Sequence, residues 1–512
     1  MEQLIVLFVI IPLASAFLIP VVGKLVPYFQ KVLTSMVLLA LTILIFSYLF
    51  SGSEATLIYK VGGWEAVENI PIGIYLVLDG LSAILLLVIN FIGLLAAFYA
   101  VGYMRRYTAE NNFYTLLCLM IAGMNGVVLT GDLFNLYVFL EIAVIASYVL
   151  VAFGIEKNEL EASFKYQVLG GMASLLILFG IGMIYWLTKT LNIADVAQLL
   201  KGNSNTSAVQ FTQIVLIAGF GLKGAMIPFH AWLPDAHSSA PSPISAMLSG
   251  VLIKAIGIYA ILRLFFNMFT ISYELALIIT VIGTLSMVIG VLLAIGQWDL
   301  KRLLAYHSIS QMGYVVIGVG MGMMILTKGG EKGVAALAIA GGLFHLMNHA
   351  VFKGLLFLNA GAIEYLLGTR NLKKMGGLGK NTPITSASSF SASMAISGIP
   401  PFNGFFSKLL IIIAAVKGHF YLLALLAVFV SIITLGSFLK FQRYAFFNKT
   451  KFEGRLLAQK IPFTMTFSMV VMAVLCLVMS LMIFPGAREV FLTPAVDVLV
   501  NATNYSTTII GF

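Results

Sequence analysis

The sequence predicts an all-α polytopic membrane protein, and three observations support this prediction. Of the 512 residues, 60% are hydrophobic and only 10% are charged, which is more apolar surface than a soluble chain of this length can bury. The apolar residues recur in stretches of roughly 18 to 25 residues, long enough for a helix to cross a bilayer. Glycine is abundant, with 47 residues, as is common where membrane helices pack closely.

We expect about 14 transmembrane helices. The N-terminal stretch lacks the basic start of a signal peptide and is therefore interpreted as the first span. The segment 51–71 is expected to form a small hairpin outside the membrane, and the tail 487–512, which is weakly amphipathic, is expected at the interface. The predicted spans are 4–22, 31–50, 76–101, 113–130, 133–153, 162–187, 210–232, 242–267, 274–296, 301–323, 335–362, 384–417, 420–443 and 461–484.

The distribution of basic residues predicts the orientation of these spans. With the N-terminus outside, 18 lysines and arginines fall on the inner side and 8 on the outer side. Both termini are therefore expected outside, in the cytoplasmic membrane of the cell. The formal net charge of +10 follows from this topology and does not require a nucleic-acid partner.

Two predicted spans contain proline breaks. Span seven is interrupted at Pro228, and span twelve at Pro400 and Pro401, within the motif GIPPFNG. The breaks are five spans apart, so two five-helix units (spans 4–8 and 9–13) would have opposite orientation, an arrangement typical of transporters. The expected division is helices 1–3 in 1–110, the first unit in 111–270, the second, inverted unit in 271–447, and helix 14 with the tail in 448–512.

Several ionisable residues fall within the predicted spans, where they are costly and therefore indicate function. Lys223 directly precedes the first break, and we expect the break to supply carbonyls and water that solvate its ammonium. In span eleven, three polar side chains recur every four residues and form one stripe on an apolar helix. The primary candidate residues are Glu141, Lys223, Lys254, His345, His349 and Lys408.

These residue types suit proton transfer. A buried Glu–Lys pair can switch: together, the lysine keeps its charge, and apart, it releases a proton. Histidine titrates near neutrality and can extend the path. The secondary candidates are Lys353 in the span-eleven stripe, Lys165, and His230, His237 and His307 near helix ends on the inner side.

Structural alternatives apply to each candidate. Glu141 could serve as a structural ion-pair partner, Lys408 could extend to the interface, and the histidines could hydrogen-bond between helices. Asp79 and Asp132 are expected to cap helices near the outer side. No cofactor or metal is expected, because His345 and His349 lack a third ligand and a neighbouring glutamate.

Several stretches resemble a known family. GLKGAMIPFHAWLPDAHSSAPSPISAMLSGVLIKAIGIYAILR, DLKRLLAYHSISQMGYVVIG, GIPPFNGFFSKLLI and LYVFLEI are similar to segments of the antiporter-like subunits of respiratory complex I, Mrp-type cation/proton antiporters and membrane-bound hydrogenases. The resemblance spans roughly residues 75 to 480. It implies a 14-helix core with inverted repeats and broken helices seven and twelve. It further implies a Glu141–Lys223 pair, a bridging Lys254, histidines His345 and His349, and a terminal Lys408.

Within this family the chain most resembles the D-type member of Mrp antiporters or its hydrogenase counterpart. One branch of complex I subunits has glutamate at the position of Lys408, so the lysine argues against that branch. We also expect the chain to lack the long lateral helix of the largest complex I subunit. The main hypothesis is a proton-translocating subunit without a catalytic site of its own, driven by redox chemistry or a sodium gradient in partner membrane subunits. The alternatives are Na⁺/H⁺ exchange and a structural membrane scaffold.

Overall fold

Long apolar helices make up most of the described chain. The computed structural model describes residues 2–51, 56–64, 71–202, 206–270, 272–449 and 460–511. Within these ranges, 12 helical segments are long and apolar enough to cross a membrane. The prediction of an all-α polytopic membrane protein is thus confirmed. Two of the basic residues expected inside, Lys451 and Arg455, lie outside the described ranges.

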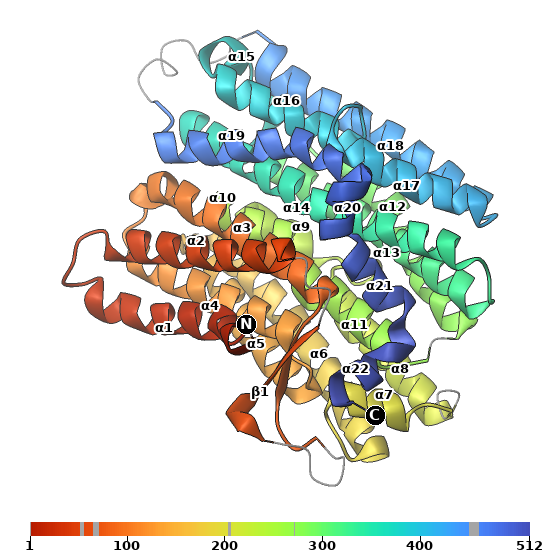
Figure 1. Ribbon diagram of the computed structural model, residues 1–512. Helices are drawn as coiled ribbons and strands as arrows, with labels where there is room; N and C mark the ends of the chain where they lie inside the picture. Colours follow the sequence, from red (N-terminus) through yellow and green to blue (C-terminus); the bar gives the residue numbers. More distant parts are fainter. Residues whose placement is uncertain are drawn as a thin grey trace.

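The first half of the chain forms the red to yellow part of the bundle (Figure 1). Its third long helix starts later than the predicted span, because Tyr75–Leu78 form a strand (β2) instead. The long helices of this half are α1 (Leu7–Val22), α2 (Phe29–Phe50), α3 (Gly80–Tyr103), α4 (Glu110–Leu129), α5 (Leu133–Val151) and α6 (Lys157–Thr188).

The second half packs beside the first. Its uninterrupted helices coincide with the predicted spans to within a few residues. They are α12 (Tyr273–Ile295), α13 (Leu300–Thr327), α14 (Lys332–Leu367), α18 (Tyr421–Gln442), which continues into a π-helical turn, and α19 (Phe463–Val478), which continues into a 3₁₀ turn.

Both predicted breaks are present. The seventh span consists of α8 (Ser207–Lys223) and the short α9 (Trp232–Ser239), and the twelfth consists of α16 (Pro383–Ser397) and α17 (Asn403–Lys417). The halves are individually too short to be among the 12 long helices. The total of 14 spans and the inverted repeats therefore stay predictions.

The eighth span is continuous but irregular. It begins as α10 (Ser242–Met247), passes through two π-helical segments, η4 (Leu248–Leu252) and η5 (Lys254–Ile258), and ends as α11 (Tyr259–Asn267). A π-helical turn bonds residue i to i+5 and often marks a functional site. Nothing in the apolar pattern of this span predicts the irregularity.

The segments outside the long helices pack against the bundle. The strand β1 (Leu57–Lys60) pairs with β2 in antiparallel register. The second strand therefore lies beyond the segment 51–71 in which we expect the hairpin, and residues 52–55 and 65–70 of that segment lie outside the described ranges. The tail forms α20 (Pro485–Phe491), α21 (Thr493–Val500) and α22 (Tyr505–Ile510), which run along one side of the bundle from α19 toward the short α7 (Ile193–Leu199) (Figure 1). Because α21 contacts α3, α11 and α14, this part of the tail is docked on protein. The place of the tail at the membrane interface stays a prediction.

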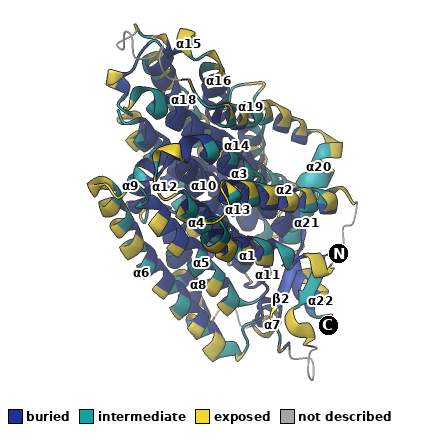
Figure 2. Ribbon diagram, turned by 90° about the vertical axis from the view of Figure 1, so that its left-hand side faces the viewer, coloured by how far each residue is buried: buried dark blue, intermediate teal, exposed yellow. Residues whose placement is uncertain are grey.

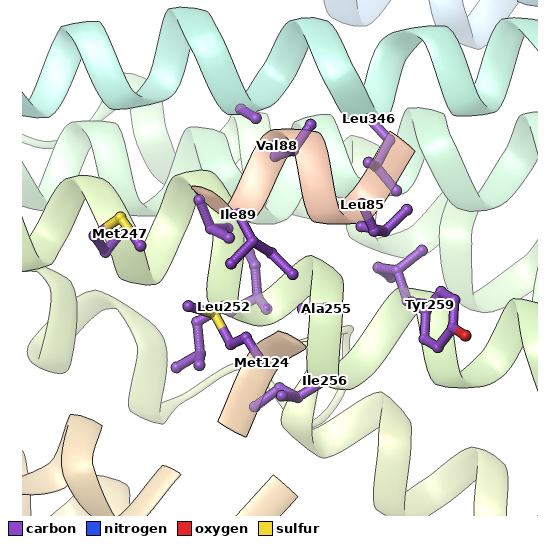
Figure 3. Close-up of a cluster of buried hydrophobic side chains, with 14 of the residues drawn as sticks. Leu85, Val88, Ile89, Met124, Met247, Leu252, Ala255, Ile256, Tyr259 and Leu346 are labelled. Carbon is purple, nitrogen blue, oxygen red and sulfur yellow. The ribbon is translucent and has the colours of Figure 1, made fainter. Parts of the chain in front are cut away.

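The centre of the bundle holds α3, the eighth span, α13 and α14. Residues of these helices are almost all buried, whereas α6 and α8 expose apolar side chains along one flank (Figure 2). The eighth span is held by an apolar cluster with Leu85, Val88 and Ile89 of α3, Met124 of α4 and Leu346 of α14 (Figure 3). In such a close-packed cluster, any shift of the helix would lose dispersion contacts on one side and create overlaps on the other.

Candidate functional site

Glu141 and Lys223 lie close together inside the bundle. Glu141 is in the middle of α5, and Lys223 is the last residue of α8. The Lys223 ammonium is 3.9 Å from the Glu141 carboxylate, and its side chain is 1% exposed, against 25% for Glu141. The sequence interpretation of these two residues as a pair thus matches their placement.

Two further side chains complete this site, and sequence reasoning missed both. The Lys223 Nζ donates to the Tyr148 hydroxyl at 3.4 Å, and the Ser174 hydroxyl of α6 donates to the Glu141 carboxylate. Tyr148 follows Glu141 by seven residues on α5, so helical periodicity could have placed it on the same face. Ser174 carries no such signal, because its position depends on how α6 packs on α5.

Among the described residues, no carbonyl of the first break accepts a hydrogen bond from the Lys223 ammonium, and solvation by water at this break stays a prediction. The carbonyl of Leu222 accepts a bond from the Trp232 indole at 2.9 Å, and the amide of Ile227 donates to the Ser286 hydroxyl at 2.9 Å. Side chains of α9 and α12 therefore satisfy these backbone groups, as buried polar groups require. The polar environment of Lys223 comes instead from α5.

Carbonyl solvation of a lysine occurs at the second break. The Lys408 Nζ of α17 donates to the carbonyl of Ile396, in the last turn of α16, at 2.8 Å. It also lies 4.7 Å from the centre of the Tyr314 ring, whose π-face attracts cations. Because α16 ends at Ser397, the carbonyl of Ile396 lacks a partner within the helix and can accept from such a donor.

Lys254 is held by its own irregular helix. Its Nζ donates to the carbonyls of Ser249 at 2.7 Å and Gly250 at 2.5 Å. The π-helical turns widen the helix at this point, which lets a buried ammonium reach carbonyls of the preceding turn. The Ser249 hydroxyl in turn bonds to the Ser308 hydroxyl of α13 at 2.6 Å.

The polar stripe of α14 faces two neighbouring helices. His345 Nδ1 is 2.9 Å from the Ser407 hydroxyl and its Nε2 is 3.2 Å from the Gln311 Oε1, while the Lys353 Nζ donates to the carbonyl of Leu304 at 2.5 Å. His349 is fully buried, and neither of its ring nitrogens has a hydrogen-bond partner among the described residues. Such a group is a natural site for a bound water.

One face of α13 connects these groups. Leu304, Ser308 and Gln311 recur at helical spacing on α13 and contact, respectively, Lys353, the Ser249 that precedes Lys254, and His345. The helix thus lines a row of buried polar groups between the eighth span and α14. Sequence reasoning identified the row but not the α13 residues that border it.

The secondary histidines have different environments. His237 of α9 is fully buried, packs against the rings of Trp232 and Phe357, and has no ring-nitrogen partner among the described residues. His307 is buried within α13, deeper than its predicted position near a helix end, and its Nε2 is 2.8 Å from the Ser437 hydroxyl. His230 lies at the partly exposed break, 3.3 Å from the carbonyl of Pro228.

Lys165 belongs to an ion-pair cluster beside α9. The Asp235 carboxylate accepts from Arg302 at 2.5 Å and from Lys165 at 3.1 Å, and Lys165 also pairs with Glu161 at 2.7 Å. The two cations balance the negative charge of the Asp235 carboxylate. Lys165 therefore contacts a surface cluster and does not reach the buried row.

A second ion pair, which is fully buried, lies at the C-terminal end of the eighth span. Arg263 of α11 binds Asp79 with both terminal nitrogens, at 2.7 and 2.9 Å, and both side chains are at most 2% exposed. Asp79 also caps α3 by accepting from the amide of Ser82, as Asp132 caps α5 by accepting from Asn135, so both predicted caps are confirmed. The Asp79–Arg263 pairing was not predicted.

The chain matches two family models. Residues 130–434 match the membrane segment of the NADH:quinone oxidoreductase/Mrp antiporter family, and residues 64–114 match the chain 5 N-terminus of the NADH-ubiquinone oxidoreductase (complex I) family. The first match covers more than half of the chain and includes every primary candidate residue.

Relatives with curated descriptions agree with these matches. The chain is 38% identical to the D-type component of the Na⁺/H⁺ antiporter of Alkalihalophilus pseudofirmus over 77% of either chain. It is 34% identical to the N-type component of the NADH-quinone oxidoreductase of Desulforudis audaxviator over 79% of this chain and 78% of the relative.

Solved structures show the same fold. A chain of the Mrp complex from Dietzia sp. DQ12-45-1b superposes with a TM-score of 0.85 at 28% identity, covering 100% of this chain and 99% of the other. A chain of the membrane-bound sulfane sulfur reductase, an archaeal respiratory membrane complex, superposes with a TM-score of 0.88 at 30% identity, covering 99% and 100%.

Sequence, fold and site therefore agree on the class of protein. The buried Lys223, Lys254 and Lys408 and the partly buried Glu141 lie in a multi-pass helical bundle with two broken helices. The chain belongs to the NADH:quinone oxidoreductase/Mrp antiporter family of antiporter-like membrane subunits.

Proposed function

We propose that the chain is the proton-translocating subunit of a multi-subunit membrane complex. The observation that carries this proposal is the placement of Lys223, an almost fully buried ammonium within 3.9 Å of Glu141. An ionisable pair at this depth is costly and therefore indicates function. The named relatives, which are antiporter, complex I and respiratory-complex subunits, support the assignment to a larger complex.

In this proposal a proton enters from the inner side near His237 and reaches Lys254. It then follows the row of buried groups along α13 and α14, past His349 and His345, and leaves through Lys408. The contacts of Leu304, Ser308 and Gln311 with successive members of the row support this route. Lys353 lies beside the route, and water at the unpartnered nitrogens of His237 and His349 would complete it.

The Glu141–Lys223 pair gates the flux. When Lys223 lies against Glu141, the carboxylate stabilises the ammonium, and when it moves away, burial favours proton release. Such motion requires little space, since the ammonium already lies between two partners. We also propose that the chain is divided into two inverted units, with the breaks at Pro228 and at Pro400–Pro401 in corresponding helices. Both termini face outside in this proposal.

Ion translocation in membrane vesicles tests this function. Glu141→Ala and Lys223→Ala should each reduce proton pumping by the assembled complex at least ten-fold, since either change removes the gate. Lys417→Ala, which alters an exposed lysine at the end of α17, is the matched control and should pump normally. Undiminished pumping in both gate variants would refute the mechanism.

Sodium/proton exchange is the second candidate, because the relative from Alkalihalophilus pseudofirmus is named as a component of a Na⁺/H⁺ antiporter. A sodium site needs several oxygen ligands, whereas Glu141 is accompanied by a lysine, which favours protons at this position. Proton flux that requires sodium and that persists in Lys223→Ala would favour a separate exchange site.

A structural scaffold would tolerate apolar replacements of Lys254 and Lys408, so pumping by Lys254→Leu and Lys408→Leu complexes separates it from the main proposal. Identification of co-purifying subunits would show whether the partners are small Mrp-type subunits or redox subunits such as a hydrogenase.

A further inference from the structure

Lys223 has two partners on one face of α5. Glu141 and Tyr148 are seven residues apart, so both point to the same side of the helix, about 10.5 Å apart along its axis. The Lys223 ammonium is within hydrogen-bond distance of the Tyr148 hydroxyl, at 3.4 Å, and beyond it from the Glu141 carboxylate, at 3.9 Å. The ammonium therefore lies between the two, bonded to the tyrosine.

Helix α6 fixes both partners. Ser174 donates to Glu141, and Gly170, one turn earlier, leaves the space that the Tyr148 hydroxyl occupies, because any Cβ at this position would overlap that hydroxyl. The Ser163 hydroxyl donates to the Tyr148 carbonyl at 2.7 Å, and the Tyr166 ring packs perpendicular to the Tyr148 ring at 4.5 Å. The position of the hydroxyl is thus determined by the α5–α6 interface.

The two partners differ in the forms of lysine that they can hold. An ionised carboxylate only accepts hydrogen bonds, so it favours the charged ammonium. A phenol hydroxyl both accepts and donates, so it can accept from an ammonium or donate to a neutral amine. Tyr148 therefore suits Lys223 in either protonation state, which is what a lysine that gains and loses a proton requires.

We propose that Tyr148 is the second resting position of Lys223 and holds the lysine away from Glu141 during the gating cycle. Tyr148 is a positioning residue in this role, since the proton passes to and from Lys223. The inference rests on the proposed gating function of the Glu141–Lys223 pair. It adds the partner that stabilises the separated state.

Labelling of Glu141 with a hydrophobic carbodiimide tests this assignment. The reagent adds to a protonated carboxyl: the carboxyl oxygen bonds the central carbon, the proton passes to a nitrogen, and an O-acylurea forms. A pocket of about 410 Å³ opens beside Glu141, lined mainly by apolar residues that include Leu116, Val138 and Ile145, and it admits such a reagent. A carboxylate paired with Lys223 is protected, so labelling measured by mass spectrometry on the complex in vesicles reports the lysine position.

Tyr148→Phe removes the hydroxyl and keeps the ring. Loss of one hydrogen bond to an ammonium should change the equilibrium between the two positions of Lys223 by about ten-fold, in favour of the position at Glu141. We therefore expect Glu141 labelling to slow by about that factor. A variant that merely loosened the packing would label faster, so the two effects have opposite signs, and unchanged or faster labelling in Tyr148→Phe would overturn the inference.

Two controls complete the experiment. Tyr166→Phe removes another buried hydroxyl on the same interface, one that contacts Ser147 at 3.0 Å and not Lys223, and should label at the normal rate. In a Lys223→Met background, Glu141 should label rapidly whether residue 148 is Tyr or Phe. Labelling tests the second resting position, and pumping by Lys223→Ala tests the gating function, so failure of one is distinguishable from failure of the other.

Discussion

The Asp79–Arg263 pair is expected to stabilise the docking of α3, α11 and the C-terminal tail. Arg263 makes two bonds to Asp79, further bonds to Ser82 and Asn267, and lies 5.1 Å from the centre of the Tyr505 ring. Arg263→Met removes all of these and leaves a buried carboxylate without its cation. Breaking a buried pair in this way costs about 3–5 kcal/mol.

The expected change in melting temperature follows from this cost. An unfolding entropy of about 2.1 cal/mol/K per residue, taken over the whole chain, converts the loss into a decrease of about 3–5 °C. Thermal unfolding of the purified complex in detergent measures it. Adding Asp79→Asn to Arg263→Met should restore part of the loss, because asparagine keeps the α3 cap but carries no charge. Equal melting temperatures for the single and double variants would refute the reasoning.

The pair also predicts a pH dependence. Burial tends to raise the pKa of the Asp79 carboxyl, but Arg263 outweighs burial and lowers it. A carboxyl whose pKa is lowered on folding contributes stability above its unfolded pKa of about 3.9 and loses it as the pH falls through its folded pKa. In Arg263→Met the carboxyl stays buried without its cation, so burial raises its pKa above the unfolded value of about 3.9. The stability difference between the wild-type chain and Arg263→Met should therefore shrink as the pH falls through this raised pKa, and shrink further below about pH 3.9 as the wild-type carboxyl is protonated in turn.

Three further predictions concern helix packing and the two helix breaks. Gly313→Ala should lower thermal stability by about 1–3 kcal/mol, because its Cβ would overlap the α12 backbone, whereas Gly436→Ala, in open space on α18, should be neutral or slightly stabilising in the same assay. Trp232→Phe should lower the free energy of unfolding by about 1–3 kcal/mol in the same assay, because it leaves the Leu222 carbonyl unpaired. A smaller decrease would imply that water replaces the indole. Lys408→Leu should assemble normally but lose proton pumping, measured in vesicles; normal pumping would exclude Lys408 from the path.

The helices and their breaks could be predicted because they depend on local sequence. A continuous apolar stretch of this length in lipid satisfies its own backbone groups as a helix, and a proline removes a backbone donor wherever it occurs. The candidate charges could also be predicted from local sequence, because an ionisable residue within an apolar span is costly whatever its neighbours are. This reasoning identified Glu141, Lys223, Lys254 and Lys408. The π-helical turns at Lys254 could not be predicted, because they arise from packing against neighbouring helices and not from the residues of the turn.

The partners of the buried charges were decided only by tertiary structure. Lys223 bonds to Tyr148, Lys408 bonds to a carbonyl freed by the second break, and Arg263 binds an aspartate 184 residues away. Each pairing depends on which helices are neighbours and on their rotation about their axes, and neither follows from the periodicity of one helix. The chain sequence thus specifies which groups are too costly to bury alone, and the packing of the bundle specifies what compensates for each of them.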